Sequence, residues 1–446
     1  MKRVLIANRG EIAVRVARTC RELGLGVVAV CSEADRDSAV TRLADTTVVI
    51  GPPAARRSYL NAAAVIQAAL QTGADAVHPG YGFLSEDADF VEACEANGLT
   101  FIGPPAAVMR RLGDKSTARA AMAAAGLPLL PGTLEPLADA DAAARAAEAA
   151  GYPVIIKAVA GGGGRGMRVV TDPADVVGAY RETHAAAQLL FGDGRVYLER
   201  YVTGARHVEV QILADGHGGC VHLGERDCSV QRRHQKLIEE TPAPGLPAEL
   251  TGRIAQAAVR GARAVGYVGA GTFEFVVDGA GGFSFMEVNC RIQVEHPVTE
   301  AAAGVDLVRE QILVAAGERL SIAQQDVRPR GAAIECRINA EDPARGFLPT
   351  PGLLTEFTAP GGPFVRVDTH AHPGYRIPAM YDSLLAKVIV WGPDRPQAIA
   401  RMRTALDEFR ATGAGIHTTA GYLSAILDDP CFRDGRHTTQ WLPDAG

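Results

Sequence analysis

The sequence predicts a protein of mixed α/β and α+β class, with an open parallel α/β unit at its N-terminus. Strand-like and helix-like segments alternate through the first part of the chain, which is typical of a parallel sheet with right-handed crossovers. From Tyr152 onward, short apolar strands and hairpins dominate. A chain of 446 residues is also longer than one hydrophobic core supports. We therefore expect three units, over residues 1–114, 115–201 and 202–446.

The N-terminal unit begins with an apolar strand over residues 3–7, a turn over 8–10 and an amphipathic helix over 11–23. A second strand is expected over residues 27–31. The strand signal then repeats over residues 48–50, 74–78 and 99–102, with helical stretches between. This order predicts an open sheet of parallel strands.

The middle of the chain changes to β character after an alanine-rich surface helix over residues 138–150. Two strands over 154–159 and 167–171 are joined by a glycine loop. Further strands are expected over residues 196–199, 207–214 and 220–225, followed by a hairpin of 271–277 with 282–288. Helices then alternate with shorter strands, which predicts a mixed C-terminal region.

Composition excludes several classes of function. The net charge of -6 argues against nucleic acid or acidic lipid as the main partner. The apolar run Val4 to Ala7 is too short for a signal peptide, and no run approaches the ~18 apolar residues of a membrane span. The eight cysteines are scattered singly, as expected for reduced thiols. We expect a cytoplasmic protein that binds neither nucleic acid nor membrane.

The glycine loop follows Lys157 and contains the glycines Gly161, Gly162, Gly163, Gly164 and Gly166. Glycines allow backbone amides to approach phosphate oxygens. The loop lies between two strands and lacks a Gly-Lys-Ser/Thr ending, so neither a P-loop nor a dinucleotide fingerprint fits. A flexible lid over ATP phosphates is the better interpretation, against the alternative of an ordinary hairpin tip.

A pair of carboxylates occupies the later hairpin. Its turn is centred near Ala280, so Glu274 and Glu287 are expected opposite each other on adjacent strands. Two facing carboxylates repel unless they share a cation, and oxygen ligands of this kind suit magnesium. The alternative is one surface Glu with a coincidental neighbour.

Alternating polar residues continue from this hairpin, at Glu287, Asn289, Arg291, Gln293 and Glu295. If the segment stays extended, its period of two places all five on one face. Arg291 is then a candidate clamp for a small oxyanion and Glu295 a candidate base. A half-buried surface strand is the alternative.

A basic cluster runs from Gln231 through His234 to Lys236. It precedes Glu239 and Glu240 in a chain that is otherwise poor in charge clusters, which favours an anion-binding surface at the bottom of a site. A solvated surface face is the alternative. Cys228 is interpreted as a structural thiol.

The motifs together resemble the biotin carboxylase family of the ATP-grasp superfamily, over essentially the whole chain. The resemblance rests on eight stretches in order: IANRGEIA, HPGYGFLSE, GDKS, KAVAGGGGRGMRVV, ERDCSVQRRHQK, GAGTFEF, EVNCRIQVEHPVTE and ECRINAEDP. It implies that residues 115–201 form the lid subdomain with its linker and 202–446 the ATP-grasp core with the C-terminal domain.

The resemblance also implies a role for each site residue. Lys115, Lys157 and the lid glycines would hold the ATP phosphates, and Glu199 with Arg200 would meet the adenine. His207, Gln231 and His234 would contact the ribose and phosphates. Glu274, Glu287 and Asn289 would bind magnesium, or manganese in its place. Lys236 and Arg291 would hold bicarbonate, Glu295 would deprotonate it, and Arg337 would stabilise the enolate-like oxygen of biotin.

The implied reaction is carboxylation of biotin by ATP and bicarbonate through carboxyphosphate. The chain ends near Trp441 without a Met-Lys-Met biotinylation stretch, so we expect a separate biotin carboxyl carrier protein and a carboxyltransferase subunit. Acetyl-CoA carboxylase of fatty acid biosynthesis is one such system, and another acyl-CoA or pyruvate carboxylase is an alternative. Arg18, Glu22 and Arg366 resemble the interface positions of a homodimer.

Two positions depart from the family pattern. Ala160 stands where a further lid glycine is common, and Arg200 stands where Lys is common, which changes the donor geometry. Two other functions remain open at this point. One is a different ATP-grasp carboxylate ligase, for example one acting on a purine precursor. The other is a nucleotide-binding regulatory subunit without catalysis.

Overall fold

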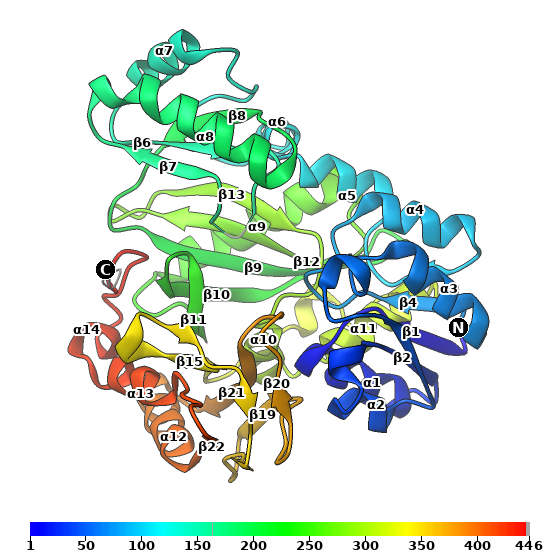
Figure 1. Ribbon diagram of the computed structural model, residues 1–446. Helices are drawn as coiled ribbons and strands as arrows, with labels where there is room; N and C mark the ends of the chain where they lie inside the picture. The colour runs from blue at the N-terminus through cyan, green and yellow to red at the C-terminus, as the bar shows by residue number, and fades with distance from the viewer. Residues whose placement is uncertain (163, 443–446) are drawn as a thin grey trace.

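The N-terminal unit is an open parallel sheet, as predicted (Figure 1). The structure, a computed structural model, describes residues 1–162 and 164–442. The strand order is β3-β2-β1-β4-β5 and every pairing is parallel. The strands are β1 (Arg3–Ile6), β2 (Gly26–Ser32), β3 (Thr46–Gly51), β4 (Ala76–His78) and β5 (Thr100–Phe101). The helices between them are α1 (Gly10–Glu22), α2 (Ala39–Leu43), α3 (Ala62–Thr72) and α4 (Ala88–Ala96). Val4, Leu5 and Ile6 are fully buried, because helices cover both faces of a parallel sheet.

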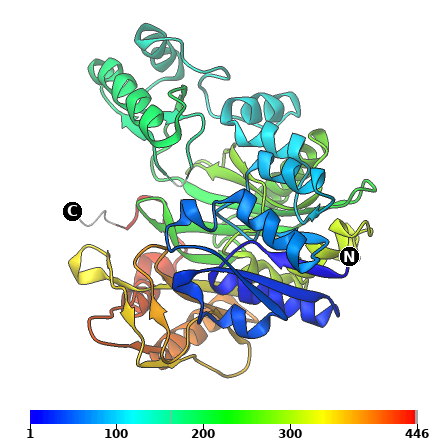
Figure 2. The ribbon, with the colours of Figure 1, turned by 45° about the vertical axis from the view of Figure 1, so that its right-hand side comes forward.

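A smaller unit, which we call the lid unit, stands apart from the rest of the molecule (Figures 1 and 2). Two helices, α5 (Ala106–Gly113) and α6 (Lys115–Ala124), lead into it. Its three antiparallel strands are β6 (Val154–Ala158), β7 (Met167–Val170) and β8 (Val196–Arg200), in the order β7-β6-β8. Helices α7 (Ala140–Ala150) and α8 (Val176–Phe191) pack on this sheet and complete its own apolar core.

An eight-stranded antiparallel sheet forms the body of the molecule, in the order β13-β12-β9-β10-β11-β14-β21-β19. Its strands are β9 (Arg206–Ala214), β10 (Cys220–Arg232), β11 (Gln235–Thr241), β12 (Gly269–Val277), β13 (Phe283–Asn289), β14 (Ala332–Asn339), β19 (Val365–Thr369) and β21 (Leu384–Gly392). Helices of this region are α9 (Ala248–Ala264), α10 (His296–Ala303), α11 (Leu307–Ala315), α12 (Arg395–Glu408), α13 (Ala420–Asp428) and α14 (Pro430–Arg433). Pairing of β11 with β14 makes the sheet continuous from the hairpins to the C-terminal region.

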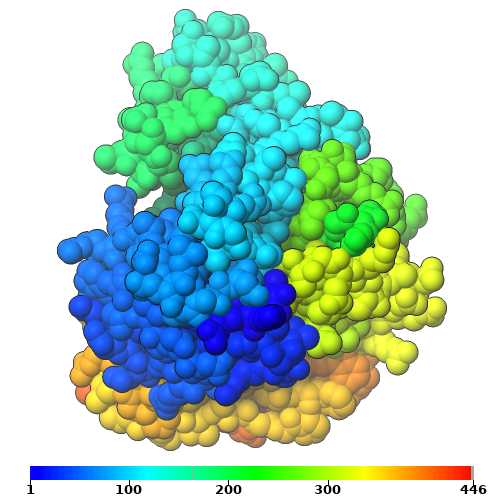
Figure 3. Space-filling model, turned by 90° about the vertical axis from the view of Figure 1, so that its right-hand side faces the viewer, coloured from blue at the N-terminus to red at the C-terminus, as the bar shows by residue number. Residues whose placement is uncertain are grey.

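Three small two-stranded sheets decorate the C-terminal region. They pair β15 (Glu341–Asp342) with β16 (Leu348–Pro349), β17 (Gly352–Leu353) with β20 (Arg376–Ile377), and β18 (Glu356–Thr358) with β22 (Arg410–Thr412). Figure 3 shows the N-terminal unit lying against this region, with the start of the lid unit above. No helix within residues 1–162 and 164–442 is long and apolar enough to cross a membrane.

Two sequence expectations need correction. The polar segment after the carboxylate hairpin does not stay extended, since β13 ends at Asn289 and residues 290–295 form an irregular loop into α10. The backbone N–H of Cys290 leaves the sheet and donates to Glu86 Oε1 at 3.0 Å. The strand expected over 220–225 continues as β10 to Arg232, and β11 follows it. Charged residues interrupt the apolar pattern there, but pairing with β9 and β14 holds both strands in the sheet.

Candidate active site

A cavity of about 1770 Å³ lies where the lid unit, the N-terminal unit and the eight-stranded sheet meet. Its wall contains every residue proposed for the site except Gly163 and Gly166. Gly163 lies outside the described residues, and Gly166 is at the base of the lid loop, next to Ala158 and Phe191. The fold therefore gathers one set of polar side chains from segments that are far apart in the sequence.

The lid loop closes over this cavity. Gly164 has a φ of +75°, and a Cβ there would lie only 2.7 Å from the Cβ of His234 on the β10–β11 turn. Only glycine permits both that backbone conformation and so close an approach. The tip of the loop is thus placed against the basic cluster, where backbone amides can surround phosphate oxygens.

Glu199 organises the lid side of the cavity. Its Oε2 accepts a 2.6 Å hydrogen bond from Arg119, and its Oε1 accepts one from the Lys157 ammonium. Both Arg119 and Glu199 are 1% exposed. Arg119 was not predicted as a site residue, although its place on α6 just after Lys115 was a usable signal. It fixes the position of Glu199 and, through it, that of Lys157.

The two carboxylates of the hairpin lie opposite each other, which confirms the predicted register of Glu274 with Glu287. Glu274 Oε1 accepts from Asn289 Nδ2 at 2.8 Å, and Glu287 Oε2 accepts from the Lys115 ammonium. Burial by itself raises the pKa of Glu274, but Lys236 and His207 outweigh it and hold that pKa below its usual value. Two carboxylates with an adjacent amide oxygen form a hard oxygen donor set, which fits magnesium.

Lys236 lies at the centre of the floor. Its ammonium donates to Glu209 at 2.6 Å, to Glu295 at 2.6 Å and to Glu274 at 3.1 Å. Burial alone lowers the pKa of Lys236, but these three carboxylates raise it well above its usual value. Lys236 is therefore a permanent cation.

Glu209 and Arg226 were both missed from the sequence. Arg226 is fully buried and donates to Glu209 Oε1 at 2.7 Å, which orients the carboxylate toward Lys236. The signal was present in β9, where His207, Glu209 and Gln211 alternate with apolar residues. It identifies a buried polar face of the sheet.

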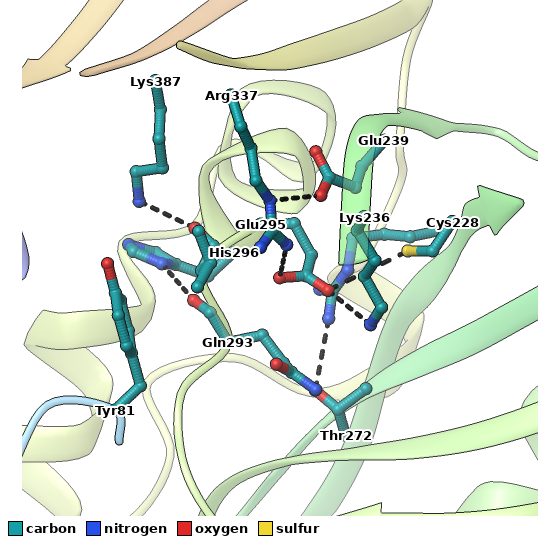
Figure 4. Close-up of polar contacts among 12 residues, drawn as sticks. Tyr81, Cys228, Lys236, Glu239, Thr272, Gln293, Glu295, His296, Arg337 and Lys387 are labelled. Atoms are coloured by element: carbon teal, nitrogen blue, oxygen red, sulfur yellow. Dashed lines mark hydrogen bonds and ion pairs between the residues drawn. The ribbon is translucent and has the colours of Figure 1, made fainter. Parts of the chain in front are cut away.

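Glu295 is held between two cations (Figure 4). Its Oε1 accepts from Lys236 at 2.6 Å and its Oε2 from Arg337 Nη2 at 2.9 Å. The residue is 0% exposed. Burial raises the pKa of Glu295, but Lys236 and Arg337 outweigh it and lower that pKa well below its usual value. Glu295 is thus an ionised carboxylate. The structure brings this predicted base into direct contact with two predicted cations, Lys236 and Arg337.

Arg291 is fixed by a fan of hydrogen bonds. Its Nε donates to Glu86 at 2.9 Å, and its two Nη atoms donate to Gln293 at 2.8 Å and Asn289 at 3.0 Å. The loop 290–295 therefore gathers its polar groups without being a strand. Glu86 was not assigned a role from the sequence, although it belongs to the quoted stretch HPGYGFLSE.

The remaining predicted residues line the same cavity. His207 Nε2 lies 3.0 Å from Glu274 Oε2, and this carboxylate raises the pKa of His207 against the lowering effect of burial. Gln231 donates to the carbonyl of Cys228 at 3.3 Å. Arg200 Nη1 donates to the carbonyl of Ala150 at 3.3 Å, so its guanidinium is tied to the end of α7.

The arrangement defines a class of protein. A glycine loop on a small antiparallel sheet closes over a second antiparallel sheet, with lysines from both sides directed at one cavity and paired carboxylates on its floor. This is the architecture and donor set of an ATP-grasp ligase, which transfers a phosphoryl group to activate an oxyanion.

Comparison with known proteins agrees with this class. The model of the biotin carboxylase N-terminal domain matches residues 1–109, that of the carbamoyl-phosphate synthase L chain ATP binding domain matches 114–323, and that of the biotin carboxylase C-terminal domain matches 335–444. The biotin carboxylase of Pseudomonas aeruginosa is 54% identical over 443 residues, covering 99% of this chain and 98% of the relative.

Two solved structures are also similar. The biotin carboxylase–β-γ-ATP complex from Campylobacter jejuni has a TM-score of 0.96 at 47% identity, covering 99% of this chain and 98% of that one. The biotin carboxylase domain dimer of Hydrogenobacter thermophilus 2-oxoglutarate carboxylase, in complex with MgADP, ADP and bicarbonate, has a TM-score of 0.96 at 46% identity, covering 99% and 97%. The chain belongs to the biotin carboxylase family. It is an enzyme whose activity is ATP-dependent carboxylation of biotin.

Proposed function

We propose that this chain activates bicarbonate with ATP inside the described cavity and transfers the carboxyl group to biotin on a carrier protein. The observation that carries this assignment is Glu295, held between Lys236 and Arg337 beside the Glu274–Glu287 pair. A candidate base, two cations able to bind an oxyanion and a candidate metal-ligand pair lie in one cavity, the combination that bicarbonate phosphorylation requires.

The nucleotide lies under the lid in this proposal. Lys115, Lys157 and the amides of the glycine loop neutralise the phosphates. Glu199 and Arg200 meet the adenine, and the ribose and phosphates are contacted by His207, Gln231 and His234. Glu274, Glu287 and Asn289 would hold magnesium, which would supply positive charge near the ATP phosphates. In the structure these carboxylates pair with Lys236 and Lys115, and a metal bound there would compete with the lysines for them.

Bicarbonate occupies the floor. Lys236 and Arg291 hold its oxygens while Glu295 takes its proton, and the resulting oxygen attacks the γ-phosphorus of ATP to form carboxyphosphate and ADP. Carboxyphosphate breaks down to carbon dioxide and phosphate, and the phosphate accepts the proton from the ureido nitrogen of biotin. That nitrogen then attacks carbon dioxide, with Arg337 stabilising the negative charge on the ureido oxygen.

The direct test is ATP hydrolysis by the purified chain with magnesium and bicarbonate, with and without free biotin. We expect bicarbonate-dependent turnover that rises strongly when biotin is added, because biotin accepts the carboxyl group and so consumes carboxyphosphate. Turnover indifferent to biotin would assign a different ATP-grasp ligase. Nucleotide binding without any turnover would assign a regulatory subunit.

Substitution Glu274→Gln tests the metal site. Loss of one charged ligand is expected to raise the magnesium concentration for half-maximal activity by about tenfold to a hundredfold. The measurement is a magnesium titration of ATP cleavage. Glu182→Gln on the exposed face of α8 is the matched control and should leave the titration unchanged. An unchanged titration for Glu274→Gln would remove Glu274 from the metal site.

The partners follow from the same proposal. A biotin carboxyl carrier protein presents biotin to the cavity, and a carboxyltransferase subunit passes the carboxyl group to its acceptor. We propose a cytoplasmic homodimer, supported by the exposed pair Arg18 and Glu22 on α1 and by Arg366, whose side chain is 34% exposed. The acceptor in this proposal is acetyl-CoA, as in fatty acid biosynthesis, another acyl-CoA or pyruvate.

A further inference from the structure

Arg337 is anchored by a residue outside the proposed catalytic set. Its Nε donates to Glu239 Oε1 at 2.6 Å, while its Nη2 donates to Glu295 Oε2 at 2.9 Å (Figure 4). Because Nε bonds Glu239, the outer edge of the guanidinium, which carries the two Nη atoms, is directed at the cavity. Glu239 therefore sets the direction in which Arg337 presents its Nη2 atom.

Glu239 has a second carboxylate beside it. Glu239 on β11 and Glu335 on β14 are directly opposed in the antiparallel register, so both side chains lie on one face of the sheet. Both are 0% exposed. Two buried carboxylates at directly opposed positions of neighbouring strands cannot both stay ionised at low cost, because their like charges repel.

The two carboxylates have different partners. Glu239 is paired with Arg337, whereas neither oxygen of Glu335 has a hydrogen-bond partner among the described residues. The ammonium of Lys387, which is opposite Arg337 on β21, instead donates to the carbonyl of Val294 at 2.7 Å and pairs with Glu11 at 3.1 Å. A buried ionised carboxyl without hydrogen bonds is unfavourable, so the proton of the pair belongs on Glu335.

Burial and the neighbouring charges favour the same assignment of the proton. Burial raises the pKa of Glu239 to about 7, with the Arg337 guanidinium opposing this rise. Burial raises the pKa of Glu335 well above its usual value; Lys387 opposes this rise and Glu239 adds to it. The Arg337 hydrogen bond thus favours the charged form of Glu239, and burial without a hydrogen-bond partner favours the protonated form of Glu335.

We propose that Glu239 is a positioning residue for biotin carboxylation, which holds Arg337 through Nε while Nη2 moves from Glu295 to the ureido oxygen of biotin. Glu335 stays uncharged in this arrangement, so that Arg337 has a single ionised anchor and its outer edge remains available. This inference rests on the proposed role of Arg337. It adds a residue that acts on the reaction only through the orientation of that guanidinium.

The opposed pair allows a matched experiment at pH 8, with the same substitution on either side. Glu239→Gln removes the charged anchor, and kcat for carboxylation of free biotin is expected to fall about tenfold to a hundredfold, the loss of one charge-assisted hydrogen bond. The KM for ATP should not change, because Glu239 does not face the nucleotide. Glu335→Gln replaces a neutral acid by a neutral amide of the same shape and should keep the full rate.

A double substitution separates positioning from general damage to the fold. In an Arg337→Ala background, Glu239→Gln is expected to cost nothing further, because its effect passes through Arg337. An equal loss in both backgrounds would overturn the proposal, as would equal losses for Glu239→Gln and Glu335→Gln. Normal carboxylation by Arg337→Ala alone would refute the proposed role of Arg337. Loss in Arg337→Ala with a normal rate in Glu239→Gln would refute only the positioning role.

Discussion

Glu295→Gln is expected to lower bicarbonate-dependent ATP cleavage and biotin carboxylation together, by roughly 100- to 10,000-fold, the range for removal of a general base. In the structure Glu295 is ionised and bound on both oxygens, which makes it a weak base. It gains basicity when Lys236 turns to bicarbonate and Arg337 to biotin. Gln keeps the shape and one acceptor oxygen, but its amide nitrogen cannot accept from the second cation and the side chain cannot take the proton.

The measurement is the steady-state rate of ADP release with saturating bicarbonate, beside direct titration of nucleotide binding. Binding should be retained, since in the proposed site Lys115, Lys157 and the lid hold the nucleotide. Glu310→Gln is the matched control, because Glu310 is also a buried carboxylate that accepts a hydrogen bond, from Ser321, and neither residue lines the cavity. A rate for Glu295→Gln near that of this control would show that the proton goes elsewhere.

Arg337→Ala is expected to bind nucleotide normally and to carboxylate biotin roughly 100- to 1000-fold more slowly, the loss seen when one oxyanion donor is removed. The ureido oxygen of biotin becomes negatively charged as its nitrogen loses a proton. Arg337 is the cation on β14 whose Nη2 lies 2.9 Å from Glu295, the proposed general base. Its removal takes away both this stabilisation and one partner of the base.

Arg337→Lys is the companion variant. Lysine keeps the charge but not the planar fork that bonds Glu239 and Glu295 at once, so an intermediate rate is expected. The assay follows carboxybiotin formation and nucleotide binding in parallel. Full activity in Arg337→Ala would exclude this residue from the site, whereas lost nucleotide binding would indicate that the variant had unfolded.

Much of the fold was predictable because local patterns carry it. Alternating apolar strands and amphipathic helices predicted the parallel N-terminal sheet, and the positions of turn residues predicted that Glu274 opposes Glu287. The extent of β10 and the existence of β11 were missed, because their charged residues hide the strand pattern. Only pairing with neighbouring strands stabilises such segments as part of a sheet.

The proposed roles of the site residues remain predictions. Where these residues lie in the fold differs in part from what the sequence pattern predicted. Residues 287–295 were expected to converge through a regular strand, and they converge through a loop whose hydrogen bonds to Glu86 and Glu274 fix it. Arg119, Glu209 and Arg226 were missed, since the local signals for Arg119 and Glu209 do not tell which partners these charges meet in the folded chain.

The sequence by itself determined the class of the fold, the glycine loop, the paired carboxylates and the family to which the chain belongs. Each of these depends only on residue type and on short-range spacing along the chain. Only the tertiary structure decided which charges meet. Glu239 and Glu335 are 96 positions apart in the chain and become neighbours through the pairing of β11 with β14. Which of two buried carboxylates keeps a proton depends on burial and on the partners brought by other strands, and these exist only in the folded chain.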